Sequence, residues 1–424
     1  MLWPKSAAPT VDFPSLTSDR TVDVAIVGGG YTGLSAALHL AGSRSVALLE
    51  ACEPGFGSSG RNAAGYLAVY LDQTPDDMIK RLGQDRGDAL NRMLATSPSI
   101  FFEIIERYGI DAGLRPTGIL VGGHKPGSHQ ELTELAQMWR RYGSDVEYLN
   151  QGRMAELTGS AKFHGGLLFK EAGTFNPMSY CRGLASAAQQ AGAEIYVRTT
   201  AEKLVREGEF WIVRTPGGTV RARNVLLATD AYAGTGHLFP ALEHTYYSLP
   251  VGMIASRPIP ERVKEFLPGG IPISDANKTN HFWLMATPDG RLSASMLPPR
   301  HDAMTADEAA APYERKLRRI FGDIEPIEWD HYWIGRVAVT ARRHPCAFNL
   351  AENLHGIGGY CGQGITAATA AGREYAKFLL SGGRESECDL PFVPPSPVPL
   401  RNVLPVMLRK VLAPLSRALD TSYR

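Results

Sequence analysis

Apolar and polar positions change period twice within the first fifty residues. Residues 22–27 (VDVAIV) form a short β-branched apolar run, typical of a buried strand, that ends directly in a glycine-rich turn. From Leu34 to Ala41 apolar residues recur at helical spacing, and residues 45–50 (SVALLE) form a second apolar run that ends on an acid. The pattern predicts a strand–helix–strand unit.

Helical and strand-like stretches then alternate in an order that predicts two sheets. The helical patterns lie within residues 75–111, 130–142, 178–197 and 306–320. Short strands within residues 201–228 predict a β-meander, and the strand-rich stretch 245–299 predicts a second sheet. A strand, a glycine turn and a helix are expected again within residues 353–380.

The two ends of the chain differ from the rest. The first twenty residues lack the apolar stretch of a signal peptide and are expected to form an ordered surface arm. Residues 391–400 are proline-rich and expected to be extended, and residues 401–420 are basic and partly amphipathic. Pro405 and Pro414 argue against a long regular helix there. Such a segment either lies on an anionic membrane surface or, more commonly, packs across its own protein.

Composition narrows the class of protein. A chain of 424 residues exceeds one ordinary core, so two domains, or one domain interrupted by another, are expected. Lys and Arg number 44 against 43 Asp and Glu, which gives no general reason to expect a nucleic acid as partner. The five cysteines are scattered without CxxC spacing, so neither a zinc site nor another metal site nor a disulfide framework is expected, and a cytoplasmic location fits best.

The glycine-rich turn is the first motif that indicates a ligand. In Gly28-Gly29-Gly30-Tyr31-Thr32-Gly33 the first glycine permits a tight turn, the third lets the backbone approach a pyrophosphate, and the last lets helix and strand pack closely. The following helix would point its amino terminus at the phosphates. Glu50 ends the next strand, where an acceptor for a ribose hydroxyl is expected. A purely structural glycine turn is the alternative.

Residues 55–66 (GFGSSGRNAAGY) favour FAD over NAD. This polar, glycine-rich loop follows the second strand and offers backbone donors to a flavin's pyrophosphate and ring, which an NAD enzyme rarely needs. An NAD-linked dehydrogenase remains the rival interpretation.

Together these segments resemble the D-amino-acid-oxidase-like (DAO) family of FAD-dependent amine and amino-acid oxidoreductases. The likeness continues through residues 175–197 and 224–232 and into GGYCGQGITAATAAG, and YTGLSAAL and SGRN are most similar to γ-glutamylputrescine oxidases within the family. The resemblance implies an α/β fold with an α+β insert: a Rossmann-like FAD-binding domain and a discontinuous antiparallel-sheet substrate domain. The implied FAD-binding domain comprises residues 1–75, 150–232 and 330–390, the substrate domain residues 76–149 and 233–329, and the tail residues 391–424.

The resemblance also implies a set of residues that bind FAD without a covalent bond, because no thiol lies around Trp333. They are Gly28, Gly30, Tyr31, Thr32, Gly33, Glu50, Ala51, Ser58, Ser59, Gly60, Arg61, Asn62, Ala63, Ala201, Thr229, Gly359, Gly362, Gln363, Gly364 and Ile365.

Two departures from the family pattern concern the substrate and the electron acceptor. Where related enzymes place an arginine two residues after a glycine to bind the substrate carboxylate, this chain has Val337 after Gly335, and Arg336 is one place off. Adjacent strand residues face opposite sides, so the shift would turn the guanidinium away unless a bulge restores it. Residues 281–300 contain no lysine of the kind that assists reaction with oxygen, which leaves oxidase and dehydrogenase both open.

The catalytic candidates are His281, Tyr247, Tyr246 and Trp283, all in the expected substrate sheet. The alternative interpretation is that these four are ordinary half-buried strand residues without a catalytic role. Hydride transfer from an amine carbon needs proximity, an apolar cavity and a neutral amine rather than a strong acid.

The expected reaction is oxidation of the C–N bond of a primary or secondary amine or amino acid to an imine, which water hydrolyses. A γ-glutamylputrescine-like N-substituted amine is the favoured substrate, with oxygen or another electron acceptor as second partner. Glycine, sarcosine or pipecolate oxidation is the alternative, and a flavin-binding subunit without its own turnover is the alternative of another class. Oligomeric state is left open.

Overall fold

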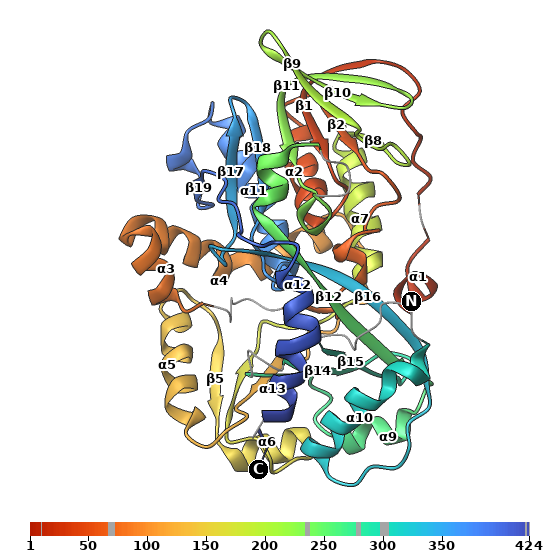
Figure 1. Ribbon diagram of the computed structural model, residues 1–424, viewed down its shortest axis with the longest axis vertical. Coiled ribbons are helices and arrows are strands. Elements are labelled where there is room, and N and C mark those ends of the chain that lie inside the picture. The colour runs from red at the N-terminus through yellow and green to blue at the C-terminus, as the bar shows by residue number, and fades with distance from the viewer. Residues whose placement is uncertain are drawn as a thin grey trace.

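The computed structural model describes residues 1–9, 11–66, 73–233, 238–276, 281–296, 305–419 and 422–423. In this part of the chain the strands form two large sheets and one two-stranded pair. The first sheet lies in the upper half of Figure 1 and the second in the lower half. The long strands β12 and β16, which belong to the second sheet, run from the middle of the view toward the lower right.

The first sheet has a parallel centre. Its order is β19-β17-β18-β11-β1-β2-β8, and β10 and β9 extend antiparallel from β11. Strand β1 pairs in parallel with β2, as the apolar runs predicted, and on its other side with β11. The strands are β1 (Arg20–Val27), β2 (Val46–Leu49), β8 (Glu194–Tyr196), β9 (Lys203–Glu207), β10 (Phe210–Thr215), β11 (Gly218–Leu227), β17 (Cys346–Ala351), β18 (Leu354–Gly358) and β19 (Phe392–Val393).

The second sheet is mostly antiparallel, in the order β16-β12-β15-β14-β13-β4-β6-β5. Strands β13 and β4 form its one described parallel pair. Its strands are β4 (Ile119–Gly122), β5 (Val146–Leu149), β6 (Gly166–Phe169), β12 (Tyr246–Ser256), β13 (Ile273–Asp275), β14 (Trp283–Ala286), β15 (Leu292–Met296) and β16 (Trp329–Thr340). The separate pair is β3 (Gly65–Tyr66) with β7 (Gly173–Thr174).

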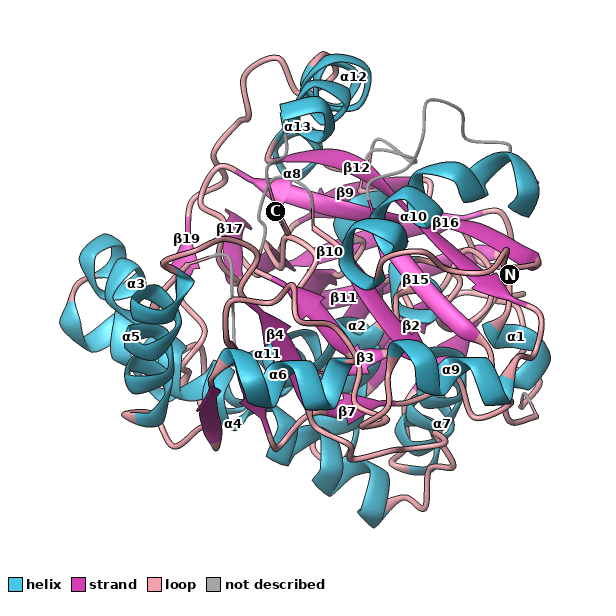
Figure 2. Cartoon of the chain, turned by 90° about the horizontal axis from the view of Figure 1, so that it is seen from below, coloured by secondary structure: helices cyan, strands magenta, loops and turns pink. Residues whose placement is uncertain are grey.

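Helices cover the first sheet and surround the second (Figures 1 and 2). They are α1 (Trp3–Ser6), α2 (Tyr31–Ala41), α3 (Pro75–Leu82), α4 (Gln84–Arg107), α5 (Ser128–Arg140), α6 (Gln151–Thr158), α7 (Pro177–Gln190), α8 (Pro240–His244), α9 (Pro260–Phe266), α10 (Ala306–Phe321), α11 (Ile365–Leu380), α12 (Leu404–Met407) and α13 (Ala413–Leu419). Capping boxes start α3 at Thr74 and α10 at Thr305, which fixes where these helices begin.

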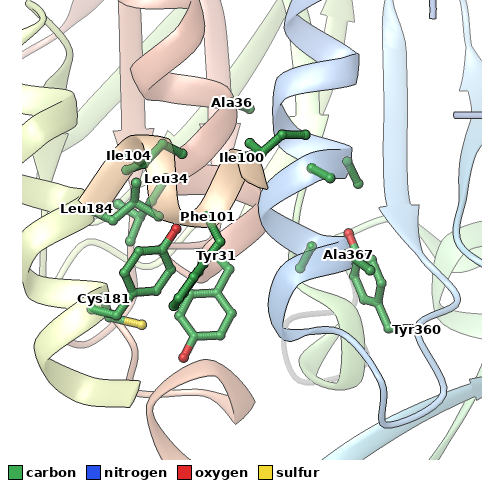
Figure 3. Packing of buried hydrophobic residues seen from close by; sticks show 14 of the residues in the cluster. Tyr31, Leu34, Ala36, Ile100, Phe101, Ile104, Cys181, Leu184, Tyr360 and Ala367 are labelled. Carbon is green, nitrogen blue, oxygen red and sulfur yellow. The ribbon is translucent and has the colours of Figure 1, made fainter. Parts of the chain in front are cut away.

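In the part of the molecule that contains the first sheet, the apolar core lies where α2, α4, α7 and α11 meet. Small residues let α2 and α11 approach closely: a Cβ added to Gly372 would lie 2.5 Å from the carbonyl oxygen of Thr32. Around this crossing Leu34, Phe101 and Leu184 are fully buried, each from a different helix (Figure 3). The cluster continues into the second sheet through Met253 and Trp333, so the two sheets share apolar packing.

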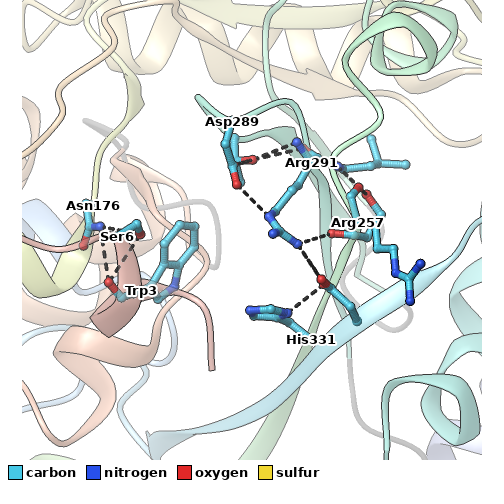
Figure 4. A network of polar contacts seen from close by, with 11 residues as sticks. Trp3, Ser6, Asn176, Arg257, Asp289, Arg291 and His331 are labelled. Atoms are coloured by element: carbon cyan, nitrogen blue, oxygen red, sulfur yellow. Dashed lines mark hydrogen bonds and ion pairs between the residues drawn. The ribbon is translucent and has the colours of Figure 1, made fainter.

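Arg291 joins three strands of the second sheet (Figure 4). Its guanidinium donates to the carbonyl oxygen of Ser256 at 2.8 Å and binds Asp330 at 2.8 Å, while its Nε binds Asp289 at 2.7 Å. The contacts tie the hairpin between β14 and β15 to the ends of β12 and β16.

The expected domain division needs changes where distant segments pair. Strands β6 and β16 belong to the second sheet, although residues 150–232 and 330–390 were expected in the FAD-binding domain. Helix α4 packs against α11, which lies with the first sheet, although residues 76–149 were expected in the substrate domain. The two-domain division stays a proposal, with these three elements moved.

The chain ends also differ from the expectation. The first residues are not only a surface arm, because Trp3 and Phe13 are buried and Trp3 Nε1 donates to the carbonyl oxygen of Asn62 at 2.9 Å. Asn176, which caps α7, binds the Ser6 hydroxyl at 3.0 Å (Figure 4). In the tail, α12 and α13 are joined by a π-turn over Leu408–Leu412, because Pro414 has no N–H to donate and interrupts the regular pattern.

Candidate active site

A cavity of about 1570 Å³ is lined by both sheets and by the tail. Its first wall is formed where the parallel strands β1, β2 and β11 end, the place at which open α/β sheets bind ligands. Its second wall comes from β12, β14, β15 and β16. The volume exceeds the roughly 300–1,000 Å³ of an ordinary small-molecule pocket, which leaves room for a dinucleotide and a substrate together.

The glycine turn after β1 has the geometry of a pyrophosphate cradle. Gly28 has φ +113°, and a Cβ there would lie 2.7 Å from the carbonyl oxygen of Ala228. At Gly30 a Cβ would lie 2.9 Å from the Ser59 hydroxyl, so the backbone is open to a ligand only because no side chain is present. Gly30, the N-cap residue of α2, has no side chain to cap the helix; Tyr31 N–H donates to the Ser59 hydroxyl at 3.2 Å, and the other N–H groups of the first turn can donate to an anion.

Glu50 stands beside this turn with both carboxylate oxygens oriented by backbone donors. Gly29 N–H donates to Oε2 at 2.7 Å and Cys52 N–H to Oε1 at 2.9 Å. Burial raises the pKa of Glu50, and these two hydrogen bonds oppose the increase. Each oxygen retains acceptor capacity for a ribose hydroxyl.

The loop after β2 is held by its own polar contacts. Asn62 Nδ2 donates to the carbonyl oxygen of Ser59 at 2.6 Å and to the Tyr31 hydroxyl at 3.1 Å. The Arg61 guanidinium lies 4.2 Å from the centre of the Phe56 ring, and its buried Nε has no protein partner. A donor left without a partner beside the cavity fits a site that receives an anionic or oxygen-rich ligand.

A second glycine-rich loop, residues 359–365, closes the cavity from the other end of the chain. Gly362 has φ +93°, and a Cβ there would lie 3.5 Å from Val337. The Tyr360 hydroxyl hydrogen-bonds to the Thr32 hydroxyl at 2.7 Å, which joins this loop to the first glycine turn. The two sequence motifs therefore meet at one cavity, as expected.

Of the twenty residues expected to bind FAD, all line the cavity except Gly33, Gly60 and Gly359. These three lie behind the wall. An added Cβ would approach the carbonyl oxygen of Gly28, Gly55 or His344 to 2.0, 2.3 or 2.2 Å respectively. They set the path of the backbone rather than contact the ligand space.

Three of the four catalytic candidates line the cavity: His281, Tyr247 and Trp283. His281 Nε2 hydrogen-bonds to the Ser274 hydroxyl at 2.8 Å, and the residue is exposed where it lines the cavity. The indole Nε1 of Trp283 is buried without a protein partner. Tyr246 is instead part of the core, with its ring 5.8 Å from that of Phe348, so its place in the structure does not favour a catalytic role.

The strand register decides between Arg336 and Val337. No bulge interrupts β16 here, since Gly335, Arg336 and Val337 pair in order with Val251, Pro250 and Leu249. Val337 faces the loop at Gly362, whereas Arg336 is exposed and its carbonyl oxygen accepts a hydrogen bond from Ser58. No bulge therefore moves Arg336 into the place of Val337, although Arg336 also borders the cavity.

Asp230 and part of the tail line the cavity but were not among the site residues predicted from the sequence. Asp230 lies three residues after the end of β11 and lines the cavity, and burial raises its pKa to about 7. Its position at the carboxyl end of a parallel strand was a usable signal. Leu408, Leu412 and Leu415 of the tail also line the cavity, which no local pattern indicates.

No helix in the described part of the chain is both long and apolar enough to cross a bilayer. Nor do the described residues bring three or more His, Cys, Asp or Glu together as a metal site.

A strand–turn–helix dinucleotide cradle that opens into a cavity under a second, antiparallel sheet defines a flavin-dependent oxidoreductase. Comparison with known sequences agrees: residues 23–378 match the DAO family, described as FAD dependent oxidoreductase, and the chain belongs to that family. FAD is therefore the cofactor, and the cradle, Glu50 and the two glycine loops fit it.

Several relatives match most of the chain, and two of them are 31% identical to it. The probable oxidoreductase OrdL of Rhizobium meliloti (strain 1021) is 31% identical over 388 residues, which cover 89% of this chain and 87% of the relative. The gamma-glutamylputrescine oxidoreductase of Escherichia coli (strain K12) is 31% identical over 381 residues, 88% and 87% respectively.

Solved structures share the fold. Glycine oxidase from Geobacillus kaustophilus superposes with a TM-score of 0.69 at 22% identity, covering 85% of this chain and 95% of that structure. L-Proline dehydrogenase from P. horikoshii superposes with a TM-score of 0.71 at 18% identity, covering 88% and 97%. The predicted fold class is confirmed.

Proposed function

We propose that this enzyme oxidises the C–N bond of an N-substituted amine of the γ-glutamylputrescine type to an imine, which water then hydrolyses. The observation that carries the proposal is Val337, which presents an apolar side chain to the Gly362 loop where related enzymes place a carboxylate-binding arginine. An amine without an adjacent carboxylate meets no unpaired charge there. The likeness to the Escherichia coli gamma-glutamylputrescine oxidoreductase supports the same substrate class.

The glycine turn, Glu50 and residues 58–63 and 359–365 are proposed to hold FAD, with Ala201 and Thr229 beside the dinucleotide. Bound FAD would supply the hydride acceptor for the amine carbon and a route for the electrons to oxygen or another acceptor. The chain's own contribution is an apolar wall that orients the amine and excludes water. Val251, Met253 and Met296 supply part of it.

His281 is proposed to take the proton that the incoming ammonium must lose. In one tautomer the neutral imidazole has a basic nitrogen besides the one that bonds to Ser274. Ser274 orients the ring through the hydrogen bond at Nε2.

The test is an anaerobic screen of amines and amino acids for bleaching of the flavin absorbance. N-substituted amines are expected to bleach the wild-type enzyme, and simple α-amino acids are expected to react far more slowly. Val337→Arg should improve the reaction with α-amino acids relative to amines, whereas the matched control Val337→Leu should not. Faster bleaching of the wild type by glycine, sarcosine or pipecolate would instead favour the amino-acid alternative.

If no compound of a broad panel reduces the bound flavin, the flavin-binding subunit without turnover becomes the better interpretation. Peroxide formation under air separates an oxidase from a dehydrogenase.

A further inference from the structure

The tail helix, defined as residues 404–419, together with Leu400 and Val403 before it, presents an uncovered apolar surface. Seven of the ten exposed large apolar side chains among the described residues belong to residues 400–415. Leu412 and Leu415 also line the cavity. The other five are Leu400, Val403, Val406, Met407 and Val411, exposed by 70, 53, 50, 41 and 56%.

This surface is exposed although the segment is fixed in place. Before the tail helix, Val398 N–H donates to the carbonyl oxygen of His244 at 2.9 Å, and Arg401 forms an ion pair with the nearly buried Glu243. After it, the Tyr423 hydroxyl donates to Asp275 Oδ2 at 2.8 Å. Figure 2 shows α12 and α13 projecting from the body of the molecule. The apolar side chains therefore remain exposed although the segment is held on both sides.

The charge of the segment indicates which class of partner would cover the apolar surface. Residues 391–419 contain four basic residues, Arg401, Arg409, Lys410 and Arg417, and no aspartate or glutamate; Arg401 is already paired with Glu243 outside the segment. Exposed apolar residues beside cations are the signature of a segment that lies on an anionic lipid surface. A second copy of the chain would bring two such cationic segments together without an acid between them, which disfavours a symmetric interface through the tail.

We propose that residues 400–419 dock this protein on the surface of an anionic phospholipid bilayer. Val403, Val406 and Val411 enter the boundary of the acyl chains, and Lys410 lies among the headgroups. Leu408 and Leu412 line the cavity, so the docking segment and the cavity are contiguous. The proposal does not depend on which amine the enzyme oxidises.

The experiment is flotation of the flavin-loaded full-length protein with vesicles of pure phosphatidylcholine and of phosphatidylcholine with 30% phosphatidylglycerol. We expect binding to the anionic vesicles only, and weaker binding as salt is raised. Val406→Ser with Val411→Ser should reduce the partition coefficient about tenfold, and Lys410→Gln should reduce it about fivefold.

Matched controls are Leu380→Ser, an apolar side chain exposed by 40% on α11, and Lys264→Gln, an exposed lysine on α9. Both should bind as the wild type does, and retained flavin absorbance shows that every variant is folded. Equal recovery with neutral and anionic vesicles, or no binding to either, overturns the proposal. A dimer in light scattering that Val406→Ser with Val411→Ser dissociates would assign the surface to a second copy instead.

Discussion

Glu50 and Glu53 lie three residues apart, but only the first faces the cavity. Glu50 accepts hydrogen bonds from Gly29 and Cys52, whereas Glu53 pairs with Arg198 on the surface. Glu50→Gln replaces one accepting oxygen by a donor and removes the charge from the contact that Glu50 is proposed to make with the ribose. FAD affinity should fall about ten- to a hundredfold.

Glu53→Gln is the matched control, since its side chain is about half exposed and should change FAD affinity little. Flavin fluorescence on dilution measures both constants. Equal affinities in the two variants would show that Glu50 does not contact the cofactor.

Asp230 gives a pH dependence of stability. Its pKa is raised to about 7 by burial, but in the unfolded chain it ionises near pH 4. Between these values the folded state binds the extra proton, so this group's contribution to stability falls as pH rises to 7 and then levels off. Asp230→Asn removes that loss. The unfolding temperature of the variant relative to wild type should therefore rise by a few °C from pH 5 to pH 8.

Asp23→Asn provides the comparison, because hydrogen bonds from Ser45 lower the pKa of Asp23 and keep it ionised throughout this window. Its difference from wild type should stay constant between pH 5 and pH 8. Parallel curves for Asp230→Asn and wild type would contradict the assignment.

Single residues show where sequence reasoning ends. The expectation that Arg336 does not take the place of Val337 used the family pattern at Gly335 as a reference, and the regular register of β16 agrees with it. No such reference existed for Tyr246 and Tyr247, which are adjacent aromatics on β12. Only the packing of β12 against Phe348 shows that Tyr246 belongs to the core.

At the scale of elements, helix α2 is constrained differently at its two ends. A Cβ on Gly33 would lie 2.0 Å from the carbonyl oxygen of Gly28, within the strand–helix turn, and backbone cannot move aside cheaply. At Gly42 nothing lies within 4 Å and φ is −71°. Gly33→Ala should displace α2, lower the unfolding temperature and weaken FAD binding at least about tenfold.

Gly42→Ala should change the free energy of unfolding by less than about 0.5 kcal/mol. Calorimetry of both flavin-loaded proteins provides the comparison. A Gly33→Ala enzyme that retained full FAD affinity would show that α2 tolerates displacement.

Elements formed by neighbouring residues were predictable, and those formed by distant pairing were not. The β1–α2–β2 unit and the meander β9–β10–β11 follow local periodicity and turns. Strand β6 pairs with β4 and β5, and β4 pairs with β13 more than a hundred residues later. The side chains of β6 would be apolar in either sheet, so nothing in its local sequence assigns β6 to the second one.

At the scale of the whole molecule, a buried ion pair connects the second sheet, helix α10 and the end of the chain. Lys316 Nζ lies 3.0 Å from Asp275 Oδ2, with side chains exposed by 3 and 1%, and the Tyr423 hydroxyl binds the same oxygen. Lys316→Met leaves a buried carboxylate without its cation. The free energy of unfolding should fall by about 3–5 kcal/mol.

Lys316→Met with Asp275→Asn should recover much of that loss, because no charge is then left buried. Urea unfolding of the three proteins measures the difference. Equal stability of the single and double variants would show that the pair does not act as a unit.

The arrangement of the first sheet also orders events during synthesis. Strand β1 leaves the ribosome before the other strands of the first sheet, and β18 and the Gly362 loop, which lines the same cavity, follow roughly 330 residues later. At about 5–20 residues per second this interval lasts some tens of seconds. The nascent chain must therefore protect its apolar central strands before it can acquire flavin, and truncated translation products should emerge colourless.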